Sequence, residues 1–323
     1  MNEKMLLKAE GVHKIYTTHI FPKRDGLGEA KMSRDLCDNL KFLGTSIGEM
    51  SGKHILDAGC GTGELSCFFS ENGAHVTGID FSESSLEYAE KLAYSKGLTS
   101  ERMTFICGSL LSYEFSKKYD VVFTHMVLHH TADPKSAFLN IARALKPGGE
   151  IIFRVFTFWD RMAPLQKSPL WKLWVVRLLG GKSAQRRVDF AEKLFYKEGH
   201  ERSHGLLKDT YLFDNYGVPI VFHHLYGELL VWMREAGIEY VGSNPPMEFA
   251  LRVGPLLDRT RMSRTAYGTF LRVTARIVLA LFPIHKFNFL KRPTMISRIL
   301  SQAVSFLTRG GSAMITVRGI KRE

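Results

Sequence analysis

The sequence is poor in cysteine, in long apolar runs and, in its second half, in acidic residues. Its four cysteines lie far apart and form no C-x-x-C pair, which argues against a disulfide framework and a cysteine zinc site and favours a reducing cytoplasm. The longest apolar run, 277–284, is far too short to span a bilayer, and the first residues lack the apolar core of a secretory signal. The 323 residues therefore predict a globular, cytoplasmic chain with a large core.

Positive charge is distributed unevenly along the chain. From residue 151 onward there are 27 lysines and arginines against 13 acids, whereas the first 150 residues hold 17 against 19. Within 251–309, eleven basic residues accompany a single acid, Asp258. A basic surface of this kind attracts anionic lipid, phosphorylated substrates or nucleic acid, and the alternative is a solvated face with no dedicated partner.

A glycine-rich turn joins an apolar run to a helical pattern within residues 53–73. The turn reads D-x-G-x-G-x-G, with Asp57, Gly59, Gly61 and Gly63. Glycines let the backbone approach a ligand closely, and the helix that follows aims its free N–H groups at a negative group. An acid that opens the turn repels pyrophosphate but suits an ammonium group. The combination predicts a zwitterion attached to a nucleoside, namely S-adenosylmethionine (SAM).

The units that follow repeat the strand-and-helix format. Residues 74–97 predict a second strand ending at Asp80, where an acid can accept hydrogen bonds from both ribose hydroxyls, and a helix capped near Ser82. Further strands are predicted at 103–111, 119–125, 148–156, 238–243 and 312–320. Between the fourth and the fifth of these seven strands, a helix begins at Asp133-Pro134, with Phe138, Ile141 and Leu145 as its buried stripe.

Four sequence blocks resemble the ordered motifs of class I SAM-dependent methyltransferases. They are ILDAGCGTGELS, VTGIDFSESSLEYA, YDVVFTHMVLHHTADP and LKPGGEIIFRVF, and together they cover roughly residues 50–157. The resemblance is greater to small-molecule methyltransferases than to enzymes that modify nucleic acids or proteins. It implies an α/β, Rossmann-like fold with a seven-stranded, mostly parallel sheet and helical insertions after strand 5 and between strands 6 and 7. It also implies methyl transfer to a small-molecule or hydrophobic biosynthetic acceptor, with S-adenosylhomocysteine (SAH) as product.

The resemblance assigns the cofactor contacts to the ends of four strands. It places Asp80 at the ribose and Phe81 against the adenine. The family usually has an acid where this chain has Ser109, so a hydroxyl or a main-chain carbonyl would hold the adenine amino group here. The predicted cofactor-binding residues are Asp57, Ala58, Gly59, Cys60, Gly61, Thr62, Gly63, Asp80, Phe81, Ser82, Gly108, Ser109, Leu110, Thr124 and His125.

Two adjacent histidines follow the fourth strand, at the edge that borders the ligand crevice of an open α/β sheet. A metal role is disfavoured because neighbouring side chains point apart, and no metal ligand is predicted. In related enzymes a histidine here faces the acceptor and can act as general base, which indicates His129 first and His130 second. The alternative is that both histidines only shape the loop. The other predicted acceptor-site residues are Tyr16, as a catalytic group, and His19, Met126, Tyr211, Asp214 and His223, which with His129 contact the substrate.

The predicted organisation has six segments. Residues 1–50 form a lid over the cofactor or a plain helix on the sheet, and 51–157 form the SAM-binding core. Residues 158–226 cap the acceptor, 227–244 supply a core helix and strand 6, 245–310 form a basic amphipathic insertion, and 311–323 form strand 7 and the C-terminus. The insertion indicates a lipid-like or anionic acceptor, or peripheral membrane contact through 251–309 with a membrane-peripheral location; the alternative is a cap packed on the core.

Two other functions remain open at this level. One is an RNA methyltransferase that uses the basic half, although no RNA-binding module is recognisable and NPPM at 244–247 follows strand 6 instead of strand 4. The other is a non-catalytic, membrane-associated protein that binds SAM. The sequence predicts a small-molecule partner over nucleic acid and gives no oligomeric state.

Overall fold

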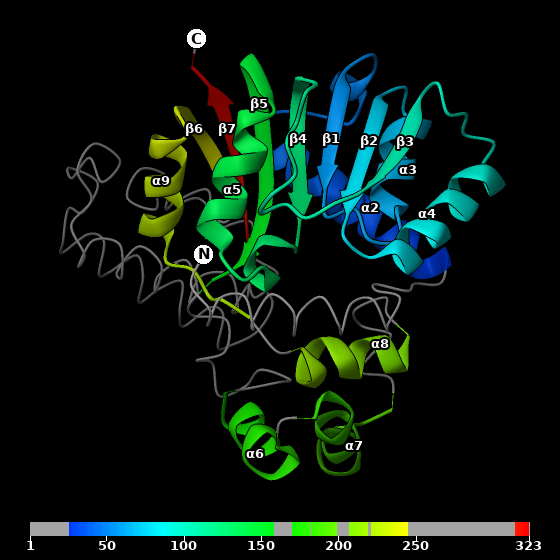
Figure 1. The fold of residues 1–323 in the computed structure, drawn as a ribbon, viewed down its shortest axis with the longest axis vertical. Helices are drawn as coiled ribbons and strands as arrows, with labels where there is room; N and C mark the ends of the chain where they lie inside the picture. Colours follow the sequence, from blue (N-terminus) through cyan, green and yellow to red (C-terminus); the bar gives the residue numbers. More distant parts are fainter. Residues whose placement is uncertain are drawn as a thin grey trace, which may run out of the picture.

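A single seven-stranded sheet forms the centre of the computed structural model, which describes residues 26–157, 170–181, 183–198, 207–218, 221–244 and 314–322 (Figure 1). The strand order is β3-β2-β1-β4-β5-β7-β6. β7 pairs antiparallel with β5 and β6, and the remaining pairs are parallel. The predicted Rossmann-like, mostly parallel sheet is confirmed. The strands are β1 His54–Ala58, β2 His75–Asp80, β3 Met103–Cys107, β4 Tyr119–His125, β5 Leu145–Phe156, β6 Ile238–Asn244 and β7 Met314–Lys321.

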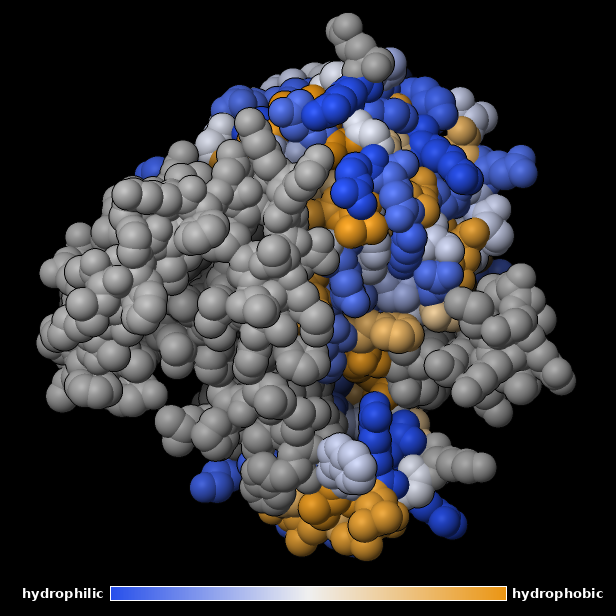
Figure 2. Space-filling model, turned by 90° about the vertical axis from the view of Figure 1, so that its left-hand side faces the viewer, coloured by the Kyte–Doolittle hydropathy of each residue, from blue (hydrophilic) through white to orange (hydrophobic). Residues whose placement is uncertain are grey.

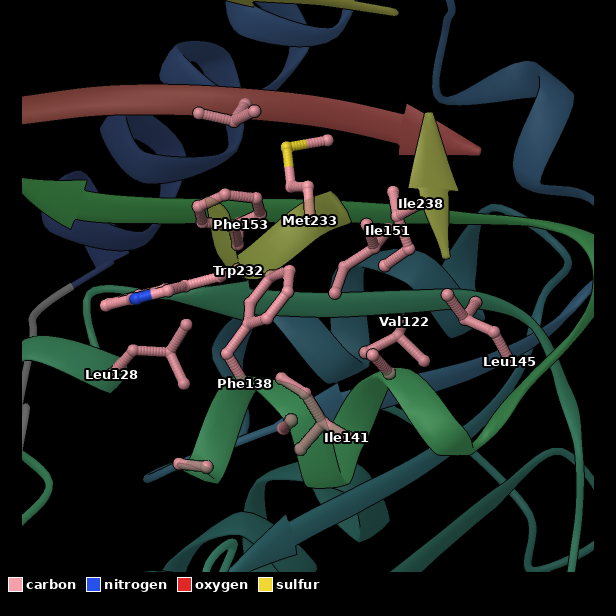
Figure 3. Close-up of a cluster of buried hydrophobic side chains, with 14 of the residues drawn as sticks. Val122, Leu128, Phe138, Ile141, Leu145, Ile151, Phe153, Trp232, Met233 and Ile238 are labelled. Carbon is pink, nitrogen blue, oxygen red and sulfur yellow. The ribbon is translucent and has the colours of Figure 1, made fainter. Parts of the chain in front are cut away.

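Helices cover both faces of the sheet. On one face lie α5 (Pro134–Arg143) and α9 (Tyr226–Glu235), which pack aromatic side chains on the central strands. The ring centroid of Phe138 lies 5.0 Å from that of Phe153 and 5.8 Å from that of Trp232, so β5, α5 and α9 meet in one cluster (Figure 3). On the other face lie α2 (Gly26–Phe42), α3 (Glu64–Glu71) and α4 (Glu83–Ser95). This two-sided burial explains why β1 and β4 are largely buried and carry apolar residues at their centres.

The helix α2 is hydrogen-bonded to β6 and β7, which lie at one edge of the sheet. Its Leu36 and Leu40 are buried in the second core cluster, and the Asn39 amide oxygen accepts hydrogen bonds from Asn244 of β6 at 2.8 Å and Thr316 of β7 at 3.1 Å. Residues 26–42 therefore form a helix that packs on the sheet. Residues 1–25, including the predicted acceptor contacts Tyr16 and His19, lie outside the described residues.

The insertion after β5 contributes α6 (Leu170–Gly180), α7 (Ala184–Phe195), α8 (Lys208–Leu212) and a π-helical turn (Phe213–Gly217). They share a small core of their own around Val176, Val188 and Tyr211, and the buried Arg187 donates to the main-chain oxygens of Tyr216 and Gly217. In Figure 1 these helices lie beyond the carboxyl ends of the parallel strands. Among the described helices, none has the length and apolarity needed to cross a membrane. The basic segment 251–309 is outside the described residues.

Two element boundaries differ from the sequence prediction. The third strand ends at Cys107, not at 111, because the chain turns after Gly108, with the Tyr113 N–H donating to the Ser109 carbonyl at 2.8 Å. Leu145 was expected on the helix stripe, but α5 ends at Arg143 and Leu145 begins β5, paired with Tyr119. Leu145 is buried in either arrangement, so its apolar character did not distinguish them. The predicted caps are confirmed: the Ser82 side chain accepts from the Ser85 N–H and Asp133 from the Ser136 N–H.

Candidate functional site

The turn between β1 and α3 is pressed against two neighbouring elements. The N–H groups of Gly59 and Cys60 donate to the Ile79 carbonyl of β2 at 2.7 and 3.1 Å. Gly59 has a φ of +83°, and a Cβ at this position would lie 2.4 Å from a methyl carbon of Val127, in the loop after β4. A side chain at Gly59 is therefore incompatible with both the backbone conformation and the space. The close packing holds the turn beside the ends of β2 and β4.

Asp57, at the end of β1, is a buried acid. Its side chain is 3% exposed, and one carboxylate oxygen accepts a hydrogen bond from the Ser66 hydroxyl at 2.5 Å. Burial raises the pKa of Asp57 to about 7, and the Ser66 hydrogen bond only partly offsets this; the nearby Asp80 and Glu64 raise it further. A positive group placed here would relieve this cost, because it stabilises the charged form of the acid.

Asp80 connects the turn to the following helix. One of its carboxylate oxygens accepts from the Gly61 N–H at 3.0 Å, and the other accepts from the Ser82 N–H at 3.0 Å. Each carboxylate oxygen can accept more than one hydrogen bond, so capacity remains for the two hydroxyls of a ribose. Burial raises the pKa of Asp80, while these N–H groups lower it. Asp80 thus holds the glycine turn to the start of α4, and its carboxylate can also accept hydrogen bonds from a ligand.

A third acid, Glu64, belongs to the same group and was missed by the sequence prediction. It begins α3, is buried, and accepts a hydrogen bond from the Thr62 hydroxyl at 2.6 Å. Its repulsion contributes to the raised pKa of Asp57. The available signal was an acid at the first helical position after a glycine turn. Three acids around one turn disfavour a pyrophosphate and favour a ligand with a positive charge.

The other predicted cofactor-binding residues lie at the same edge of the sheet. The Gly108 N–H donates to the Asp80 carbonyl at 2.8 Å, which joins the end of β3 to the end of β2. The Ser109 hydroxyl accepts from the Leu111 N–H, whereas the Leu110 side chain is buried in the core. Thr124 and His125 end β4, directly beside β1. The four strand ends are consecutive in the sheet, so one extended ligand can reach all of them.

Strained backbone separates β4 from the histidine loop. Met126 has a φ of +63° and is the one non-glycine residue of the described chain with a positive φ. Its N–H donates to the Arg154 carbonyl at 3.0 Å. Such strain persists only where the surroundings enforce it, and it concentrates at ligand sites. The backbone thus turns sharply at a residue predicted to contact the acceptor.

His129 lies in the 3-10 turn Leu128–His130, which follows this strained residue. Its side chain is 0% exposed, and its ring centroid lies 4.2 Å from that of His130 and 4.4 Å from that of Phe156. Neither ring nitrogen has a hydrogen-bond partner among the described residues. Burial lowers the pKa of His129 well below its usual range, and His130 lowers it further, so the ring is neutral. A buried imidazole without partners is costly for the protein unless a ligand uses it.

A segment of the insertion covers this loop. The Phe222 N–H donates to the His129 carbonyl at 2.8 Å, and the His224 N–H donates to the Phe156 carbonyl at 3.0 Å. His223 also joins the group, with its ring centroid 5.9 Å from that of Phe156. The sequence had not predicted this main-chain pairing, because it joins residues that are far apart in the chain.

Two other predicted acceptor contacts lie elsewhere in the insertion. Tyr211 is buried in the cluster formed by α6, α7 and α8, and Asp214 lies in the π-helical turn. The third predicted insertion residue, His223, lies beside the histidine loop through its ring contact with Phe156. In the described parts of the chain, no group of three or more histidines, cysteines or acids is arranged to hold a metal ion.

The sheet order and the acid-lined turn define a doubly wound α/β domain whose strand ends suit a nucleoside-containing, positively charged ligand. Residues 49–174 match the family model described as a methyltransferase domain. This part of the chain is therefore similar to a methyltransferase domain.

Curated relatives match less than half of the chain. The ubiquinone biosynthesis O-methyltransferase of Leptothrix cholodnii is 30% identical over 143 residues, which make up 44% of this chain and 56% of that protein. The enzyme of the same name from Idiomarina loihiensis is 38% identical over 116 residues, or 35% of this chain and 46% of that protein. The chain thus spans about half the length of the curated relatives it matches.

Similarity to a solved structure extends over more of the chain. PKMT2 from Rickettsia typhi has a TM-score of 0.52 at 16% identity, covering 86% of this chain and 52% of that one. At this level of identity the two proteins share the fold.

Proposed function

We propose that the protein transfers a methyl group from SAM to an oxygen atom of a small, hydrophobic biosynthetic acceptor and releases SAH. The observation that carries this proposal is the glycine turn surrounded by Asp57, Glu64 and Asp80, which suits a ligand bearing both a nucleoside and positive charge. The choice of oxygen and of a small molecule is supported by the names of the curated relatives, which are O-methyltransferases of ubiquinone biosynthesis.

Some residues of the site would bind SAM, and others would position the acceptor. Asp57 would pair with the ammonium group of SAM, and Asp80 would accept hydrogen bonds from the ribose hydroxyls. The loop after β4 would hold the acceptor oxygen in line with the methyl group. In this displacement the C–O bond forms as the C–S bond breaks, and the acceptor loses a proton. Most of the catalysis would come from alignment, which depends on a rigid strand-end scaffold.

His129 is the group we assign to the acceptor hydroxyl. A neutral imidazole whose ring nitrogens have no partner among the described residues can accept that hydrogen bond and take the proton as the bond forms. Because the His129 side chain is fully buried, the acceptor can reach it only if a neighbouring segment of the protein moves. Segment 221–224 is held against this loop and β5 by two main-chain hydrogen bonds, and it is the segment that we expect to move. The competing role is loop architecture alone, for which the ring packing on His130 and Phe156 is the evidence.

The central experiment combines calorimetry with methyl transfer. We expect SAM and SAH to bind the purified protein, and label from methyl-labelled SAM to appear on apolar hydroxyl compounds but not on matching amines or thiols. Absence of SAM and SAH binding would refute the proposal. Binding without transfer to any acceptor would favour the non-catalytic alternative, and transfer to RNA with strong salt dependence would favour an RNA methyltransferase.

Cofactor affinity is expected to rise with pH between about pH 5.5 and 7, a range in which the α-amino group of SAH stays charged. The pKa of Asp57 is about 7 in the ligand-free protein, and the ammonium group would lower it in the complex. Binding therefore releases a proton, and affinity should increase by up to about tenfold per pH unit, flattening near pH 7.

Calorimetry of SAH binding in buffers of different ionisation enthalpy measures this proton release directly. Asp57→Asn is the matched control, because it removes the titrating group and should abolish the pH dependence while also weakening binding. Equal SAH affinity at both ends of the range in the parent protein would show that Asp57 does not meet the ammonium group.

A further inference from the structure

The helix α6 turns large apolar side chains to solvent. Trp174 is 74% exposed, Leu178 is 78% exposed and Leu179 is 62% exposed. The opposite side of the helix packs on α7, where Val176 is fully buried and Gly180 lies against Arg187. Figure 2 shows hydrophobic surface gathered at the lower end of the molecule, where Figure 1 places α6 and α7. We call Trp174, Leu178 and Leu179 the apolar face of α6.

Basic side chains border this face. At 100° per residue, Arg177 lies on one side of the arc from Trp174 to Leu179, and Lys172 lies on the other. Lys172 also contacts the Phe195 ring of α7, with its ammonium nitrogen 5.4 Å from the centroid. The helix carries no acidic residue. An exposed apolar surface flanked by cations attracts a partner that presents both an apolar region and negative charges.

We propose that the apolar face of α6 docks onto an anionic lipid bilayer and lies in the interfacial region. Eleven residues cannot span a bilayer, which requires about 20, but they suffice for a helix lying parallel to the surface. Tryptophan and leucine would enter the interface while Arg177 and Lys172 meet the lipid phosphates. The proposal uses only residues of α6, and it does not rest on the proposed methyl transfer.

The composition of the face argues for lipid over a protein partner. A specific, stable protein interface uses roughly 20–30 residues on each side, far more than these three exposed side chains. A symmetric contact between two copies would place Arg177 and Lys172 near the same cations of the second copy, at an electrostatic cost. A bilayer needs no shape complementarity, and its anionic headgroups neutralise those cations.

The test is co-sedimentation of the full chain with vesicles, comparing phosphatidylglycerol–phosphatidylcholine mixtures with phosphatidylcholine alone. We expect binding to the anionic vesicles that weakens with salt. The double variant Leu178→Glu/Leu179→Glu should reduce the partition coefficient by at least about tenfold. Leu178→Ser/Leu179→Ser, which adds no charge, should also reduce it. Both changes affect exposed positions, and unchanged thermal melting would confirm that the fold is retained.

A matched control is available elsewhere on the surface. Leu27 and Tyr94 are 82% and 87% exposed on α2 and α4, so Leu27→Glu/Tyr94→Glu makes the same change in charge and should leave vesicle binding intact. The proposal is overturned if the parent does not bind anionic vesicles, or if the α6 variants bind them like the parent. It is also overturned if light scattering shows that the α6 substitutions dissociate a dimer that does not itself bind vesicles.

Discussion

Asp80→Ala is expected to weaken SAH binding by at least about 100-fold. A hydrogen bond to a charged group contributes about 1.5–3 kcal/mol, and the side chain would lose two such bonds to the ribose, with each 1.4 kcal/mol corresponding to tenfold in affinity. The substitution also frees the N–H groups of Gly61 and Ser82, so the turn and the start of α4 would lose their common anchor.

Isothermal titration with SAH measures this loss, with circular dichroism to verify the fold. Glu87→Ala is the matched control, because Glu87 is an exposed acid on α4, the helix that follows Asp80, and its removal changes the charge equally. We expect the control to bind SAH within about twofold of the parent protein. If Asp80→Ala retained near-parental affinity in a folded protein, Asp80 would not be the ribose contact.

His129→Ala is expected to lower turnover by about 10²–10⁴-fold while leaving SAH affinity nearly unchanged. The estimate is the usual contribution of a positioned general base, which acts in the transition state and not in cofactor binding. Single-turnover methyl transfer to the best acceptor found in the panel measures the chemical step, and calorimetry measures the affinity.

Two further variants separate proton transfer from packing. His129→Phe keeps a ring against His130 and Phe156 but removes both nitrogens, so it should lose turnover as fully as the alanine variant and melt no earlier than the parent. His130→Ala tests the second histidine. Retained turnover in His129→Phe would assign His129 to loop architecture, and loss in His130→Ala alone would move the base to His130.

The sequence predicted the fold well wherever local signals decide structure. Apolar runs ending in glycine or an acid placed β1 and β2, because strands buried on both faces must be continuously apolar. The N-termini of α4 and α5 could be predicted because the side-chain oxygens of Ser82 and Asp133 cap the first turn of each helix. These signals involve residues within a few positions of one another, so they are readable without the tertiary structure.

Features that depend on distant contacts were not predicted. The end of β3 and the assignment of Leu145 depend on which strand lies alongside, and the burial of Glu64 depends on how its helix meets the sheet. Pairing of segment 221–224 with the histidine loop joins parts of the chain that carry no complementary sequence signal. Tyr211 had the chemistry of an acceptor contact, but its apolar surroundings in the insertion could not be foreseen from composition.

The position of β7 between β5 and β6 has a consequence for how the protein is made. β6 ends at Asn244 and pairs in the sheet only with β7, which begins at Met314. A ribosome adding about 5–20 residues per second needs roughly 3–14 seconds to synthesise the intervening chain. Until that chain has been made and has left the ribosome, the edges of β5 and β6 that pair with β7 lack their partner strand. The nascent protein must therefore keep these edges from pairing wrongly, and the nucleoside-binding half is complete well before the sheet is closed.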